Sequence, residues 1–99
     1  MARFDVYADA ENAGYLLDVQ ADLLESLNTR IVVPLMAVRT APAPARRLNP
    51  VFSIQSGQYV MVTQFLSAVP CSILKTPVAS LAQHDAEIMG ALDMVLTGV

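Results

Sequence analysis

Near the start of the chain, apolar and polar side chains alternate with a period of two, in residues 3–8 and again in residues 15–20. This period is typical of a β-strand with one buried face. Residues 11–14 separate the two stretches and read Glu-Asn-Ala-Gly, which are mostly turn-forming types. The pattern predicts a β-hairpin.

The next apolar stretch, residues 30–39, does not alternate and is almost wholly apolar. Such a run suits a strand that is covered on both faces. Pro34 lies inside it, and proline has no N–H group to donate to a neighbouring strand. We therefore expect an edge position or a bulge at Pro34.

A second hairpin is predicted by residues 51–55 and 59–65, which flank the turn-forming residues 56–58. Residues 71–74 follow a proline and predict a short fifth strand.

Between the hairpins, residues 40–50 contain three prolines, each of which favours extended backbone before it. We expect an exposed, semi-extended loop with two possible roles. It is either a surface connection, or a docking edge for an extended partner segment in which Arg46 and Arg47 pair with acidic side chains.

From about residue 81 the apolar residues recur every three or four positions, which predicts an amphipathic helix. Ser80 and Gln83 match the capping-box pattern, so the helix is expected to begin there. The apolar stripe consists of Leu81, Ile88, Leu92, Val95 and Val99. The whole pattern predicts a mainly β fold with one C-terminal α-helix, an SH3-like small barrel or twisted antiparallel sheet, in one domain spanning residues 1–99.

The composition also predicts that the protein forms an oligomer. Apolar residues make up 55% of the chain and charged residues 15%, whereas charged residues usually reach about 25%. A monomer of this size cannot readily hide so much apolar surface, which predicts a subunit interface.

Charge and cysteine content narrow the partners and the compartment. Six basic against nine acidic residues give a net charge of −3, which argues against direct nucleic-acid binding and favours a protein partner. The chain has neither an 18-residue apolar run nor a signal-peptide pattern, so no membrane association is expected. Its single cysteine fits a reducing, cytoplasmic location.

The sequence predicts no catalytic residue, cofactor or metal site. His84 is the one histidine and is interpreted as a solvated residue of the first helical turn, and Cys71 as a small buried residue in a strand. Asp18, Asp22 and Glu25 are interpreted as solvated acids rather than a paired acid–base site.

The end of the predicted helix is unusual for its charge. Asp93 and the α-carboxylate of Val99 lie where a helix carries partial negative charge, an arrangement that costs a few tenths of a kcal/mol when exposed. Either this exposed charge is uninformative, or the acidic, partly apolar tip is aimed at a cationic surface of a partner.

Several stretches taken in order resemble the CcdB family of toxins from type II toxin–antitoxin modules. The most specific are YLLDVQADLL at residues 15–24, RIVVPL at residues 30–35 and SAVP at residues 67–70, and the chain closes with Gly98 and Val99. The resemblance implies a homodimer that binds the A subunit of DNA gyrase and traps the gyrase–DNA cleavage complex. It also implies a CcdA-like antitoxin, through which the complex contacts DNA and represses its own operon.

The resemblance carries two sets of binding residues onto this sequence. The gyrase-binding set is Leu23, Leu24, Asp93, Thr97, Gly98 and Val99. The antitoxin-binding set, from residues 8–14 and 40–50, is Asp9, Glu11, Asn12, Arg46, Arg47 and Asn49.

One position departs from the family pattern: Thr97 stands where the family has tryptophan. A tryptophan at an interface can contribute about 2 kcal/mol or more, and losing about 2.7 kcal/mol weakens binding roughly a hundredfold. Fold and family are thus better supported than potency. The leading hypothesis is a gyrase poison, and the alternative is a non-poisoning homologue that binds antitoxin. An mRNA endoribonuclease of the same architecture is a third hypothesis, which the net charge and isolated His84 disfavour.

Overall fold

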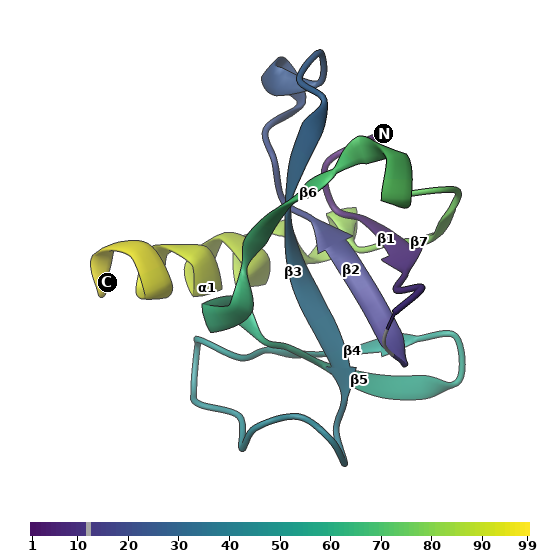
Figure 1. Ribbon diagram of the computed structural model, residues 1–99. Helices are drawn as coiled ribbons and strands as arrows, with labels where there is room; N and C mark the ends of the chain where they lie inside the picture. The colour runs from purple at the N-terminus through teal and green to yellow at the C-terminus, as the bar shows by residue number, and fades with distance from the viewer. Residues whose placement is uncertain (12) are drawn as a thin grey trace.

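The computed structural model describes residues 1–11 and 13–99 and confirms a mainly β fold with one C-terminal helix (Figure 1). Asn12, one of the predicted antitoxin contacts, lies outside the described residues. The strands of the described chain are β1 (Asp5–Ala8), β2 (Gly14–Asp18), β3 (Thr29–Ala37), β4 (Val51–Ile54), β5 (Gly57–Met61), β6 (Ser67–Pro70) and β7 (Pro77–Ser80). The helices are the 3-10 turns η1 (Asp22–Leu24), η2 (Thr63–Phe65), η3 (Cys71–Ile73) and η4 (Ala82–His84), followed by α1 (Asp85–Thr97).

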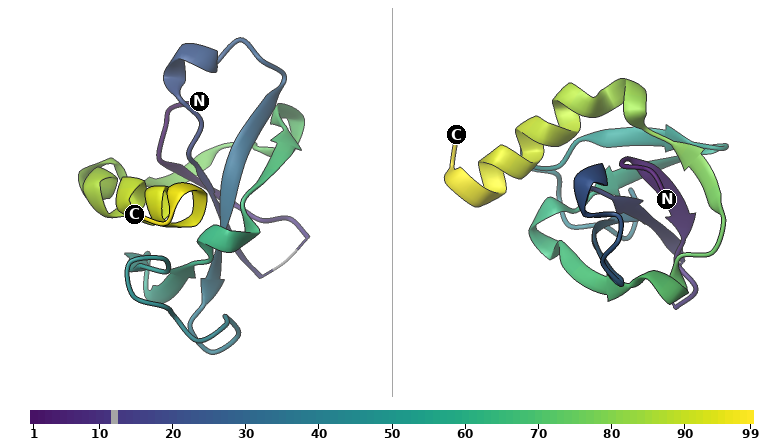
Figure 2. Two further views of the ribbon diagram at one scale, coloured as in Figure 1. Left: turned by 90° about the vertical axis from the view of Figure 1, so that its left-hand side faces the viewer. Right: turned by 90° about the horizontal axis from the view of Figure 1, so that it is seen from above.

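The central strand is β3, which pairs antiparallel with β2, β5 and β6. One side of β3 pairs with β2, which leads outward to β1 and β7. Its other side has two partners, β6 along residues 29–32 and β5 along residues 35–37. The strands curl around a common core into a half-barrel, as the view from above in Figure 2 shows.

The change of partner along β3 explains Pro34, which is neither at an edge nor in a bulge. Pro34 pairs with Leu16 of β2 on one side, and on the other its carbonyl oxygen accepts a bond from the Val62 N–H at 3.0 Å. Because a residue's nitrogen and carbonyl face the same side of a strand, the Pro34 nitrogen points to where β5 has ended and β6 has not begun. The bond that proline cannot form is the return bond to the Val62 carbonyl, which accepts instead from the Phe65 N–H at 2.9 Å.

The predicted hairpins are confirmed as β1–β2 and β4–β5. The loop predicted at residues 40–50 lies in the connection between β3 and β4, residues 38–50. The predicted fifth strand at residues 71–74 is wrong: this segment begins with the 3-10 turn η3. The strands lie on either side of it, β6 paired with β3 and β7 with β1. Cys71 therefore starts a turn and is only partly buried.

The helix begins later than predicted. The Ser80 hydroxyl accepts a bond from the Ala82 N–H at 3.2 Å, at the start of the 3-10 turn η4 rather than of α1. The Leu81 N–H bonds to the Phe4 carbonyl at 2.9 Å, so the chain still lies against the sheet at this point. The capping-box prediction is therefore wrong, and α1 begins at Asp85 without a side-chain cap.

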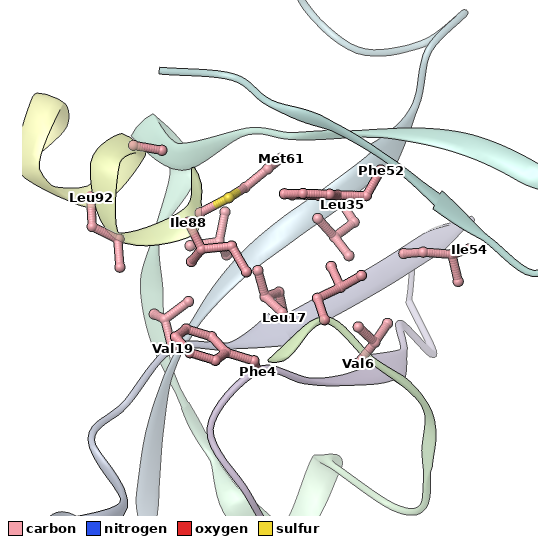
Figure 3. Packing of buried hydrophobic residues seen from close by; sticks show 13 residues of the cluster. Phe4, Val6, Leu17, Val19, Leu35, Phe52, Ile54, Met61, Ile88 and Leu92 are labelled. Carbon is pink, nitrogen blue, oxygen red and sulfur yellow. The ribbon is translucent and has the colours of Figure 1, made fainter. Parts of the chain in front are cut away.

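The main core lies between the half-barrel and the first half of α1 (Figure 3). From the helix, Ile88, Ala91 and Leu92 are buried against the strands. Each fully buried aliphatic side chain stabilises the fold by about 1.5 to 3 kcal/mol. The predicted stripe weakens beyond them, since Val95 is half-buried and Val99 is 74% exposed. Only the first half of the helix is thus anchored in the core.

Candidate partner-binding site

The helix tip, residues 93–99, ends in a defined turn. The N–H of Gly98 donates to the Met94 carbonyl at 3.0 Å, and the Thr97 hydroxyl donates to the Asp93 carbonyl at 2.7 Å. Gly98 has φ 78°, the left-handed conformation in which glycine avoids the strain of a side chain. This turn ends α1 at Thr97.

The tip exposes apolar surface that the chain's own core does not cover. Leu96 is 69% exposed and Val99 is 74% exposed. Figures 1 and 2 show the last turns of α1 extending beyond the strands, with the C-terminus at the far end of the helix. Exposed apolar side chains at a projecting end are typical of a surface that meets a partner.

Leu23 and Leu24, also predicted to bind gyrase, lie in the exposed turn η1. Leu23 is 91% exposed and Leu24 is 46% exposed. The Gln20 side chain holds the turn by donating to the Leu24 carbonyl at 3.0 Å and accepting from the Ile31 N–H at 3.1 Å. All views in Figures 1 and 2 place this turn apart from the helix tip. One subunit therefore does not bring the predicted gyrase-binding residues together.

The loop of residues 38–50 is organised by Asn49, which was predicted to bind the antitoxin. The structure buries this side chain. Its amide donates to the Met61 carbonyl at 3.0 Å and to the Gln64 side chain at 2.8 Å, and its oxygen accepts from the Ala45 N–H at 3.0 Å. Asn49 thus shapes the loop from within rather than lying on its surface.

Arg46 and Arg47 are both exposed on this loop, as predicted for a docking surface. The Arg47 guanidinium donates a hydrogen bond to the main-chain oxygen of Val99. A residue predicted to bind antitoxin therefore contacts one predicted to bind gyrase. The sequence gives no signal for this contact, because the two residues are 52 positions apart.

Asp9 and Glu11 lie in the β1–β2 connection, where the Asp9 carboxylate accepts the Glu11 N–H at 3.1 Å. Beside this connection, a groove of about 720 Å³ runs between β2, the end of β3 and the β4–β5 hairpin. The rings of Tyr15 and Tyr59 meet edge to face in it, with centroids 5.0 Å apart. Arg39 and Asp9 also line the groove, so it combines aromatic surface with charges of both signs.

The most deeply buried charges were missed by the sequence analysis. Asp18, interpreted as solvated, is fully buried against the equally buried Arg30, with Nη2 and Oδ2 2.6 Å apart. Burial raises the pKa of Asp18, opposed by the hydrogen bonds from Arg30 and the Gln20 N–H. Leu74 and Val69 help to cover this second face of the sheet. Leu16, two positions before Asp18, lies on the same face of β2, and its apolar side chain is the sequence signal that this face is covered.

His84 and Cys71 sit in surroundings that favour a structural role. His84 is half-buried rather than solvated, with its ring 5.0 Å from Phe52 and its Nδ1 3.4 Å from Glu87. Within the described residues, His, Cys, Asp and Glu side chains form no group of three that could hold a metal ion. Among the residues that the structure describes, no helix is both long and apolar enough to span a membrane.

Solved structures of low sequence identity share this fold. A mycobacterial endoribonuclease superimposes with a TM-score of 0.76 at 17% identity, over 97% of this chain and 90% of the other. A mycobacterial endoribonuclease in complex with its cognate antitoxin gives a TM-score of 0.75 at 17% identity, over 97% and 94%. The Mycobacterium tuberculosis toxin MazF-mt6 gives 0.74 at 12% identity, over 92% and 94%. At these identities the likeness defines the fold.

The family follows from the sequence itself. Residues 3–98 match the family model described as CcdB protein, which covers nearly the whole chain. The chain belongs to the CcdB family.

Proposed function

We propose that this protein is the toxin of a type II toxin–antitoxin module, which binds the A subunit of DNA gyrase and traps the cleavage complex. It acts in the cytoplasm, as a protein-binding inhibitor rather than an enzyme, and a CcdA-like antitoxin neutralises it. The exposed apolar helix tip carries this proposal, because Leu96 and Val99 project from the fold with no core to bury them. Membership of the CcdB family supplies the expected target.

A homodimer completes the proposed gyrase-binding surface. The exposed turn with Leu23 and the helix tip lie apart in one subunit. A second copy is one way to place the turn of one subunit near the tip of the other. Phe65, which is 52% exposed in η2, offers further apolar surface for such an interface.

The charge distribution argues against RNA cleavage as the function. An RNA-cleaving site needs basic residues facing the phosphate backbone. Arg30 is fully buried with Asp18 and is therefore unavailable to a phosphate. His84 packs against Phe52, with its Nδ1 3.4 Å from the Glu87 carboxylate, in contacts that favour a structural role.

The non-poisoning alternative rests on Thr97. Its hydroxyl proton is donated to the Asp93 carbonyl, so the side chain offers a partner a methyl group and a hydroxyl acceptor but no free donor. The aromatic area that a tryptophan would supply is missing at this position.

The direct test is a DNA cleavage assay with purified protein and DNA gyrase of the same host, using wild type and Thr97→Trp. Linear DNA released after denaturation is expected with wild type, and more of it with Thr97→Trp. Cleavage with Thr97→Trp alone would support the non-poisoning alternative. Activity with neither variant, or cleavage of an added RNA, would overturn the gyrase proposal.

A further inference from the structure

The contact between Arg47 and Val99 joins two segments that the fold otherwise keeps separate. Arg47 lies in the loop between β3 and β4, whereas Val99 follows the last turn of α1. The guanidinium donates to the main-chain oxygen of Val99. Val99 is 74% exposed, so this bond restrains a segment with little burial to support it.

The loop presents Arg47 from a fixed base. On its C-terminal side the Leu48 carbonyl accepts a bond from the Thr63 hydroxyl, and Asn49 is bonded to Met61 and Gln64. The Asn49 N–H also bonds to the Ala45 carbonyl at 3.0 Å, which closes a turn around Arg47. A hydrogen-bonded base of this kind limits the positions from which the guanidinium can reach the tip.

The backbone is strained at the Arg47 end of the contact, whereas the left-handed conformation at the other end is ordinary for a glycine after a helix. Arg47 has φ 66°, a left-handed conformation that costs a side-chain-bearing residue about 1 kcal/mol or more. Gly98, next to Val99, has φ 78°. Strained backbone persists where surrounding structure enforces it and is concentrated at functional sites. Here the two turns bring Arg47 and Val99 toward each other.

Charge favours the same arrangement. Residues 38–50 carry Arg39, Arg46 and Arg47 and no acidic residue, whereas α1 carries Asp85, Glu87 and Asp93 and no basic one. The negative end of the helix dipole lies at the tip, where a guanidinium is stabilising.

We propose that Arg47 is a positioning residue for the helix tip: it clamps Val99 against the loop and fixes Gly98 and Val99 in the orientation that a partner binds. The clamp itself follows from the contacts of the free protein, while its role in partner binding rests on the proposed function. An ordered tip enters a complex without losing backbone freedom on binding, which strengthens affinity.

The experiment compares wild type with Arg47→Asn and Arg47→Lys, with Arg46→Asn as the matched control. Asparagine tolerates the left-handed conformation but is too short to reach Val99. Lysine keeps a donor and a positive charge. Arg46 is an exposed neighbour whose side chain forms no hydrogen bond with the described residues. Unchanged unfolding midpoints would show that each variant keeps the fold.

The first readout is the backbone order parameter of Val99 from ¹⁵N relaxation of the free protein. We expect it to fall from the rigid range near 0.85 to below about 0.6 in Arg47→Asn, to recover in part in Arg47→Lys, and to stay unchanged in Arg46→Asn. An unchanged value in Arg47→Asn would overturn the clamp, whatever the protein binds.

The second readout is affinity for the purified DNA gyrase A subunit. Arg47→Asn is expected to bind about tenfold more weakly, since roughly one residue's backbone must then be ordered on binding. A disordered tip with wild-type affinity would overturn the positioning role while leaving the clamp in place. Absence of binding by wild type itself would refute the proposed function, and the order parameters would still decide whether the clamp exists.

Discussion

At the scale of single residues, the burial of Asp18 and Arg30 could not be predicted from the alternation of apolar and polar residues along a strand. A period of two assigns Asp18 to the face opposite Leu17, and that face is expected to meet solvent when a sheet has one core. Here it is covered by a second apolar cluster that includes Tyr7, Leu16 and Leu74. The covering segment lies far along the chain, so local pattern alone could not predict that these charges are buried.

Removing one partner of this pair is expected to destabilise the fold strongly. Asp18→Leu or Arg30→Met should each lower the free energy of unfolding by about 3 to 5 kcal/mol, because the uncompensated partner stays buried. The double variant Asp18→Leu with Arg30→Met should recover most of that loss. Urea unfolding of all four proteins measures the coupling. Additive losses in the double variant would contradict a directly coupled pair.

The raised pKa of Asp18 predicts how this pair responds to pH. Since the folded state holds the proton more tightly than the unfolded state, Asp18 contributes less to stability as pH rises through the window above its ordinary pKa of 3.8. Relative to the double variant, wild type should therefore lose stability from about pH 4 upward until Asp18 is fully ionised. Urea unfolding across this range tests the sign, and a relative gain in stability would contradict it.

At the scale of elements, the sequence predicts the segments whose burial follows a simple pattern. The two hairpins and the helix place apolar residues on a core face. The loop of residues 38–50 contains three prolines, which indicate a loop in the sequence. By contrast, β6 and β7 are mostly exposed and are held by backbone pairing to β3 and β1. Strands of this kind have no apolar alternation to detect, so neither was predicted, whereas the short apolar run at residues 71–74 was mistaken for a strand.

The loop of residues 38–50 depends on Asn49 for its shape. Asn49→Ala removes the bonds to Met61, Gln64 and Ala45 and leaves the buried Met61 carbonyl short of a donor. We expect a loss of about 2 to 3 kcal/mol in the free energy of unfolding, together with faster amide exchange at Arg47. The exposed Asn28→Ala is the control and should change stability by less than about 0.5 kcal/mol. Equal effects of the two substitutions would exclude an anchoring role for Asn49.

At the scale of the whole molecule, apolar surface is distributed in a way that a lone subunit does not explain. Leu23, Phe65 and Leu96 are more than half exposed on three separate elements. The apolar excess was visible in the composition, whereas the positions of these side chains required the fold.

A homodimer is the expected state in solution. Sedimentation equilibrium at micromolar concentration should give about twice the subunit mass of 10.6 kDa. Phe65→Glu tests whether η2 lies in the interface, because a buried unpaired carboxylate would shift the equilibrium toward the monomer. A wild-type mass of one subunit at this concentration would contradict the dimer.

The most direct test of the account is calorimetric titration of the chain into the DNA gyrase A subunit, comparing Val99→Ser with Val78→Ser. Both valines are exposed, one at the helix tip and the other on β7. We predict that wild type and Val78→Ser bind equally and that Val99→Ser binds at least about tenfold more weakly, since a central apolar contact is lost. Equal binding by all three proteins, or none by wild type, would contradict the claim that the helix tip binds gyrase.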